Sequence, residues 1–315
     1  MARGYVTIGG KACNAKKAYL VKGKLTYKGK RAYVVKNGKT CLSWSGTEAG
    51  EMIVTESGTI TIPSGVSLVD IFCVGGGGGA GGWSQTAQYS TDYTLVGYTE
   101  FHGGGGGGGH TETAFDVEVT PGETLTVIIG AGGRTGRSFC SNVEPYNTFS
   151  YGDLSYLQAG ADGGATSVKR GSTTLCTASG GSGGARRGGV NTDTGVVTCA
   201  KGGNGGSGGC AGSIYNMNAN YSVFVYNGGV DGGDGDPGSN AEVGAGQGYT
   251  TRAFEETTGT LYSNGGDGYG STAAATANSG DGANSAVGLG IDSSGYVNRY
   301  GGSGIVIIRW KEREV

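Results

Sequence analysis

Short segments with the pattern of β-strands recur along the chain, separated by long stretches without one. Residues 67–74 carry apolar side chains at nearly every position, which predicts a strand buried on both faces. Residues 113–119 alternate between apolar and polar positions, which predicts a strand with one buried face. Further short strands are expected at residues 59–63, 124–129, 165–168, 174–176 and 305–308. Because no segment has a helical period, the pattern predicts an all-β, jelly-roll-like β-sandwich.

Glycine follows these predicted strands directly and makes up 71 of the 315 residues. The runs at 75–79 and 103–109 are unbroken. Extended polyglycine forms a threefold left-handed helix that rises about 3.1 Å per residue and has no internal hydrogen bonds. Its N–H and C=O groups therefore need partners outside the segment. The runs are either flexible linkers or packed polyglycine II helices that bond to one another, and their position directly after strands favours the packed helices.

The first 45 residues form a basic module with an internal repeat. Tyr5, Tyr19 and Tyr33 are spaced 14 residues apart, and each repeat has two short strand-like segments with a glycine turn between them. Residues 1–44 hold eleven Lys or Arg and no Asp or Glu, so the rest of the chain is acidic. A strand pair this small is not stable alone and must stack on its copies, on sister chains or on another protein. The module is either a solvated β-meander or an attachment module; its regular spacing argues against nucleic-acid binding.

Residues 46–315 are predicted to form the second domain, in which tyrosine-rich inserts separate the glycine segments. Tyr mixed with Ser, Thr and Asn is typical of binding surfaces, because Tyr gives a large amphipathic contact at low entropy cost. The alternative is that these aromatic residues cap the glycine segments and pack locally. The candidate contact residues are Trp83, Tyr89, Tyr93, Tyr98, Tyr146, Tyr151, Tyr156, Tyr215, Tyr221, Tyr226 and Tyr262.

Catalytic and metal-binding motifs fail on inspection, so we expect no enzyme, no cofactor and no metal site. The segment 127–135 imitates a dinucleotide fingerprint, but Thr135 stands at the third glycine position and no helix follows. The two histidines, His102 and His110, bracket the run 103–109 and are expected at opposite ends of one polyglycine helix. The seven cysteines include no C-x-x-C pair, which predicts mostly free thiols. No apolar run approaches the length of a membrane span, so no membrane insertion is expected.

Three segments resemble the glycine-rich domains of phage tail proteins. They are the opening strand and glycines at 62–76, the segment Pro121–Gly133 and the ending Gly301–Trp310. The N-terminal repeats are similar to modules that precede such domains in tail fibres. The resemblance implies a polyglycine-II-containing adhesin of a tail fibre or tail tip that binds a host cell-surface receptor, either a glycan or a protein. Similar domains also occur in the ectodomain of anaplastic lymphoma kinase and its relative, which are secreted.

The expected function is therefore receptor binding through the tyrosine-rich loops, with residues 1–45 attached to other virion tail proteins. Tyr5, Tyr19 and Tyr33 are the candidate attachment residues. We expect a protein of the virion tail, made in the host cytoplasm without a signal peptide, and the sequence leaves its oligomeric state open. A structural virion protein without receptor contact and a bacterial surface adhesin are the two alternatives.

Overall fold

The computed structural model describes residues 49–89, 95–140, 157–186, 200–212, 251–267, 274–285 and 299–311, together with several short strands outside these ranges. For the strands before residue 49, and for most of those farthest from the sandwich, it describes the course of the backbone.

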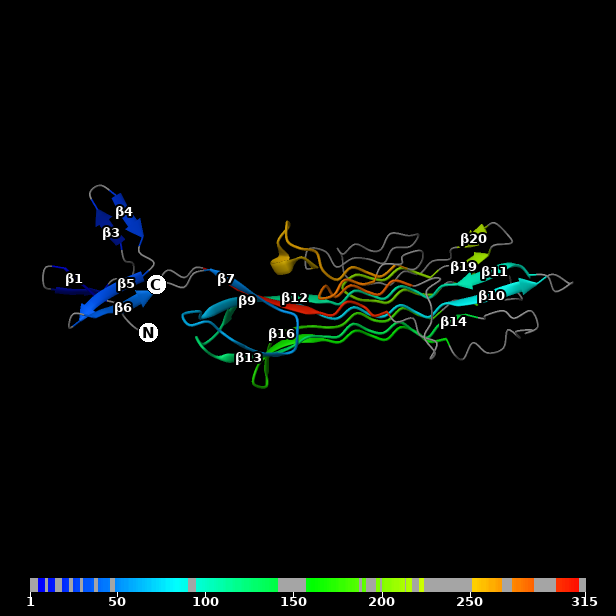
Figure 1. The fold of residues 1–315 in the computed structure, drawn as a ribbon, viewed down its shortest axis with the longest axis horizontal. Helices are drawn as coiled ribbons and strands as arrows, with labels where there is room; N and C mark the ends of the chain where they lie inside the picture. Colours follow the sequence, from blue (N-terminus) through cyan, green and yellow to red (C-terminus); the bar gives the residue numbers. More distant parts are fainter. Residues whose placement is uncertain are drawn as a thin grey trace.

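Two antiparallel four-stranded sheets pack into a sandwich (Figure 1). One sheet has the order β12-β9-β21-β7 and the other the order β16-β15-β13-β8. Their strands are β7 (Gly50–Val54), β8 (Gly58–Thr61), β9 (Leu68–Val74), β12 (Thr111–Glu118), β13 (Thr124–Ile128), β15 (Thr166–Arg170), β16 (Thr173–Ala178) and β21 (Ile305–Trp310). The all-β sandwich predicted from the alternation is confirmed.

Aliphatic side chains fill the space between the two sheets. Ile71 on β9, Leu125 on β13 and Val168 on β15 are all completely buried there. The opposite face of β9 is buried as well, because the segment that contains η3 (Ala253–Glu255) covers it. Phe72 is completely buried under Phe254, with 5.8 Å between the ring centroids. The continuous apolar run of β9 therefore reflects burial on both faces, as predicted.

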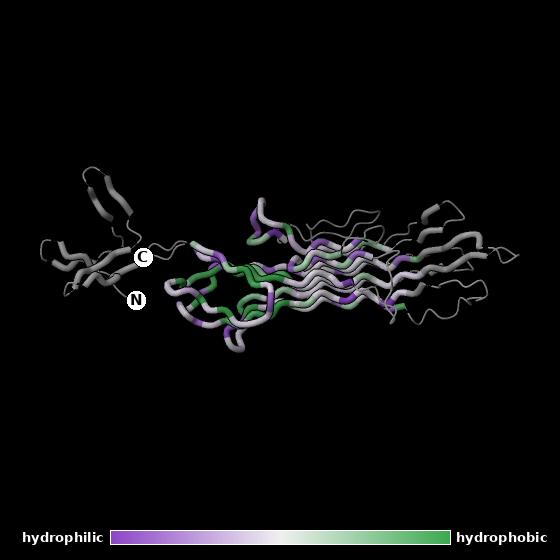
Figure 2. The backbone as a smooth tube through the Cα atoms, in the orientation of Figure 1, coloured by the Kyte–Doolittle hydropathy of each residue, from purple (hydrophilic) through white to green (hydrophobic). Residues whose placement is uncertain are grey.

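Glycine-rich segments leave the sandwich and run side by side to a second set of strands (Figure 1). Apolar residues concentrate in the sandwich, whereas the glycine-rich part has nearly neutral hydropathy along its length (Figure 2). The far strands are β10 (Ser84–Tyr89), β11 (Leu95–Phe101), β14 (Phe139–Cys140), β19 (Ile214–Asn216) and β20 (Tyr221–Val223), which form one sheet, and the pair β17 (Gly189–Val190) and β18 (Val197–Thr198). We call the five-stranded sheet β14-β10-β11-β19-β20 the distal sheet.

Three antiparallel hairpins make up the N-terminal module. They are β1 (Tyr5–Ile8) with β2 (Lys11–Asn14), β3 (Tyr19–Lys22) with β4 (Leu25–Lys28), and β5 (Arg31–Lys36) with β6 (Lys39–Ser45). The two strands expected in each repeat are therefore present. Tyr5, Tyr19 and Tyr33 lie on the first strand of their hairpins, and the attachment role of these residues stays a prediction.

Candidate functional site

The glycine-rich segments form a lattice in which neighbours run in both directions. Residues 75–82 lead away from the sandwich, and residues 103–109 lead back toward it. The amide groups of Gly75, Gly78 and Gly81 donate to the carbonyl groups of His110, Gly107 and Gly104, which is an antiparallel pairing with a step of three residues. This step is the period of the polyglycine II helix.

Segment 75–82 lies at the centre of the lattice. Among the described residues it bonds to six other segments, at positions 104–110, 133–136, 158–164, 181–184, 283 and 302. Gly75, Gly76 and Gly77 donate in turn to segments 104–110, 158–164 and 302. The bonds to the first two of these segments then repeat every three residues along the helix. A Cβ atom added at any glycine of this segment would lie within 2.2 Å of a backbone oxygen, and Ala80, the single non-glycine residue of the segment, is completely buried.

Segment 103–109 has the same environment. It bonds to segment 75–82 and to five others within residues 179–185, 203–206, 207–210, 266 and 280–283 of the described chain. A Cβ atom added at Gly106 would lie 2.1 Å from the carbonyl oxygen of Gly78. Both unbroken glycine runs of the sequence thus lie in helices that bond to six neighbouring segments among the described residues.

Segment 130–137, at the edge of the lattice, carries a non-glycine residue at every third position, and Thr135 is one further, buried non-glycine residue between them. The periodic positions are Ala131, Arg134 and Arg137, which are exposed or half-buried, whereas Gly130 and Gly133 are buried. A threefold helix at the edge of a lattice turns one of its three faces outward, and side chains are sterically allowed on that face. This glycine-glycine-X period is a signal in the sequence that our sequence analysis missed.

Asp and Asn side chains complete the hydrogen bonds of the peripheral segments. The carboxylate of Asp281 accepts from the amide of Asn264 at 2.9 Å, and the side-chain oxygen of Asn284 accepts from the amide of Asp267 at 2.7 Å. Both bonds join residues 17 apart, and the second bond lies three residues further along both segments than the first. These side chains stand where the carbonyl group of a further helix would otherwise bond.

Aromatic and polar side chains close the distal end of the lattice. Trp83 and Phe101 are 4% and 6% exposed, and the amide of Trp83 donates to the hydroxyl of Ser138 at 3.2 Å. His102 is 1% exposed, and its burial lowers the pKa of the imidazole to about 4. His102 and His110 stand at opposite ends of helix 103–109, as predicted. Phe101 is the last residue of β11 and Trp83 directly precedes β10, so this layer adjoins the distal sheet.

The distal sheet brings four of the candidate tyrosines into one element. Tyr89, Tyr98, Tyr215 and Tyr221 lie on β10, β11, β19 and β20. Glu100 pairs with Tyr215 across β11 and β19. Because Tyr98 is two residues from Glu100 on the same strand, Tyr98 and Tyr215 occupy positions on the same face of the sheet.

The remaining candidate residues are in different places. Trp83 is buried under the distal sheet. Tyr262 packs against Phe72 on the sandwich with 5.5 Å between the ring centroids, and burial raises the pKa of its hydroxyl. Both side chains therefore have a packing role rather than a role in receptor contact. The other five candidates lie outside the described residues: Tyr93, Tyr146, Tyr151, Tyr156 and Tyr226.

Comparison with known families agrees with this architecture. Residues 53–311 match the model of a glycine-rich domain, which is well over half of the chain. The chain belongs to the glycine-rich domain family. A comparison with curated proteins gave no match.

The sandwich of this glycine-rich domain carries a charged network on the outer face of the β9 sheet. Asp70 is 5% exposed, and its carboxylate accepts from the amide of Asp116 at 3.0 Å and from Nε of Arg309 at 3.2 Å. Arg309 also bonds to Glu256, and its guanidinium lies 3.8 Å from the centroid of the Phe254 ring. One arginine thus ties the strand pair β9–β21 to the η3 segment that covers it.

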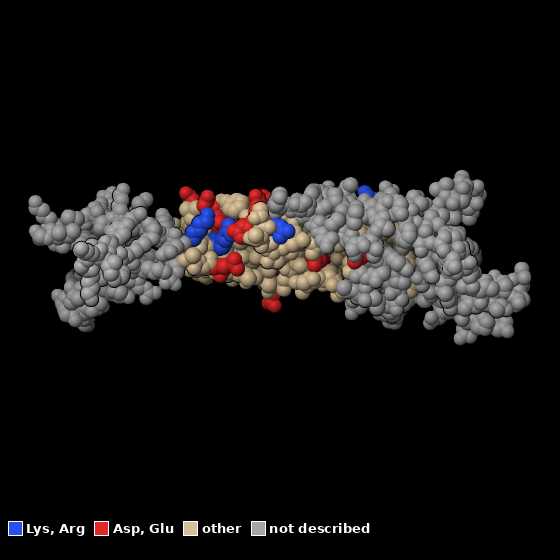
Figure 3. Space-filling view, turned by 90° about the horizontal axis from the view of Figure 1, so that it is seen from above, with Lys and Arg blue, Asp and Glu red and all other residues tan. Residues whose placement is uncertain are grey.

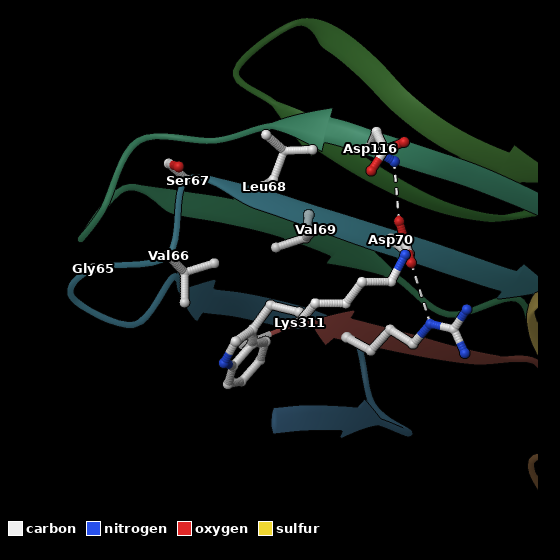
Figure 4. A pocket seen from close by; sticks show the side chains of 10 residues that line it. Gly65, Val66, Ser67, Leu68, Val69, Asp70, Asp116 and Lys311 are labelled. Carbon is white, nitrogen blue, oxygen red and sulfur yellow. Dashed lines mark hydrogen bonds and ion pairs between the residues drawn. The ribbon is translucent and has the colours of Figure 1, made fainter. Parts of the chain in front are cut away.

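A hollow beside this network opens at the end of the sandwich away from the lattice (Figure 4). Val66, Leu68 and Trp310 give it apolar walls, and Asp70 and Lys311 stand at its margin. Acidic and basic side chains also gather at this end on the face seen in Figure 3. The buried carboxylate of Asp70 is already engaged by Arg309, so it offers no free charge to a ligand.

No group of three or more His, Cys, Asp or Glu side chains suited to a metal ion occurs in the part of the chain that the structure describes. Nor does any helix in that part have the length and apolar character needed to cross a membrane.

Proposed function

We propose that this protein is a receptor-binding tail-fibre or tail-tip protein of a phage. In this proposal the distal sheet and the loops around it contact a host cell-surface receptor, and the N-terminal module attaches to other tail proteins. The observation that supports it most is the lattice: two helices, each bonded to six neighbouring segments among the described residues, connect the sandwich to the tyrosine-bearing distal sheet. A support that is ordered before binding reduces the entropy lost on binding.

The chemistry of the distal sheet favours a glycan receptor. Tyr98 and Tyr215 share a face of the sheet with Glu100, and Gln85 pairs with Glu100 on the neighbouring strand. Aromatic rings stack on the apolar faces of sugars, and carboxylate and amide groups bond to their hydroxyls. These residue types stand at adjacent register positions of one face of the sheet.

Binding of the fluorescent full-length chain to a panel of intact bacterial strains tests the proposal. A variant with Tyr89, Tyr98, Tyr215 and Tyr221 changed to Ala should bind at least about tenfold more weakly, because aromatic anchors dominate binding surfaces. Tyr300→Ala is the matched control, since Tyr300 is 49% exposed and pairs with Arg134 in the lattice, outside the distal sheet. The control should bind like the unmodified chain.

Two results would count against this function. Folded protein that binds to no strain would favour a structural role within the virion. Equal loss of binding in the Tyr300 variant would show that contact is not confined to the distal sheet. Competition with polysaccharide prepared from a bound strain separates a glycan receptor from a protein receptor.

A further inference from the structure

Two cysteines from different sheets meet at the point where the lattice leaves the sandwich. Cys73 is on β9 and is completely buried, and Cys176 is on β16 and is 4% exposed. The thiol of Cys176 lies 3.6 Å from the carbonyl oxygen of Glu112 and 3.9 Å from that of Ile71. Glu112 is the register partner of Cys73 on β12. The sulfur of Cys176 therefore contacts the strand pair β9–β12 at the level of Cys73.

The environment of the two thiols agrees with direct contact between them. A hydrogen bond to Cys176 is the largest cause that raises the pKa of Cys73, and burial is the second. Both residues are free thiols in this structure. A protonated thiol is a poor nucleophile, and Cys73 is also completely buried, so in the closed sandwich Cys73 is protected from exchange.

Each cysteine also precedes a lattice helix by two or three residues. Cys73 is followed by the central helix 75–82, and Cys176 by segment 179–186. These helices run in parallel, because Gly181 and Gly184 donate to Gly76 and Gly79. A covalent link between the cysteines would fix the alignment of the two helices at their common origin.

We propose that Cys73 and Cys176 form a disulfide between the two sheets when the protein meets an oxidising environment. The oxidant is a small-molecule or protein disulfide. One cysteine thiolate attacks it to give a mixed disulfide, and the second cysteine displaces the remaining thiol. The Cys73–Cys176 bond forms, the bond of the oxidant breaks, and two thiols leave with the two protons. Because both sulfurs are buried, the reaction occurs during folding or when the sandwich opens transiently.

Refolding of the full-length chain in a buffer of reduced and oxidised glutathione tests this proposal. Free thiols are then alkylated in denaturant, and the linked peptides are identified by mass spectrometry. The expected product is a peptide pair joined through Cys73 and Cys176. The oxidised protein should also melt about 5 °C or more above the reduced protein, because the link restricts the unfolded chain.

Variants separate this link from general oxidation. Cys73→Ala and Cys176→Ala should both lose the difference in melting temperature between oxidised and reduced protein. Cys210→Ala is the control, because Cys210 is buried in the lattice rather than in the sandwich, and it should keep the difference. Complete alkylation of both Cys73 and Cys176 after oxidation, or links from either to another cysteine, would overturn the proposal. Peptide mapping uses the unmodified chain and does not depend on the variants folding.

Discussion

At the scale of single residues, glycine in this protein is required by contact on all sides rather than by flexibility. A turn glycine such as Gly122 has a positive φ of 81°, and a Cβ there would meet nothing within 4 Å. Gly106 is the opposite case. Its φ lies outside the left-handed region and suits any residue, but the surrounding backbone leaves no room for a side chain. The two classes of glycine should respond differently to substitution.

Gly106→Ala should destabilise the protein by about 3 kcal/mol or more, since overpacking against rigid backbone exceeds the usual cost of an extra methyl group. Gly58→Ala is the matched control, because its Cβ would meet nothing within 4 Å and its φ is not positive. The control should be neutral or stabilise by up to about 1 kcal/mol. Urea unfolding of the two variants measures both effects. Equal stability would show that the lattice can open around a methyl group.

His102 should make stability depend on pH. Its pKa is about 4 in the folded protein because of burial, below the ordinary value of 6.5, so the unfolded chain binds the proton more readily. Stability is therefore fully present above pH 6.5 and falls as the pH drops from 6.5 toward 4. The melting temperature measured across this range should decline less in His102→Gln than in the unmodified chain. Parallel curves for the two proteins would exclude His102 as the cause.

At the scale of elements, the alternation of apolar residues predicted the sandwich strands because each has a face in the core. Strand β7 lies at a sheet edge, where Glu51 and Ile53 are exposed, and its pattern was too weak to predict it. The sequence predicted that the glycine segments form packed polyglycine II helices. It did not predict which helices are neighbours, because glycine has no side chain that depends on its surroundings. Trp83 and Tyr262 were chosen for residue type, and composition alone does not separate a buried aromatic residue from an exposed one.

Substitutions of Asp281 test how much the side-chain hydrogen bonds at the edge of the lattice contribute to stability. Asp281→Ala removes the acceptor of the Asn264 amide and should cost about 1–3 kcal/mol, because it leaves a partly buried N–H without a partner. Asp281→Asn keeps an oxygen in place and should cost much less. Thermal unfolding of the two variants gives the comparison. A similar loss in both would indicate that the charge matters rather than the hydrogen bond.

At the scale of the whole molecule, the protein combines two ways of ordering a chain. The sandwich is stabilised by apolar burial, and the lattice by hydrogen bonds between backbones that each contribute only about 0.5–1.5 kcal/mol. Such a lattice is stable only when nearly all its groups are paired, so it should open as one unit.

Hydrogen exchange tests this cooperativity. Amides in segments 75–82 and 103–109 should exchange no faster than those of β9 and β21, at the rate of global unfolding. Mass spectrometry of the exchanged protein resolves these peptides. Fast exchange in the glycine segments, with slow exchange in the strands, would mean that the lattice opens independently of the sandwich.

The lateral direction of the lattice bonds has a mechanical consequence. A force that pulls the distal sheet away from the sandwich acts along the helices and therefore across the bonds between them. Sliding one helix past its neighbours requires many bonds to rupture together, whereas peeling would break them one after another. The sandwich and the lattice together should therefore resist such a pull better than the apolar core alone would, because many backbone hydrogen bonds bear the force at the same time.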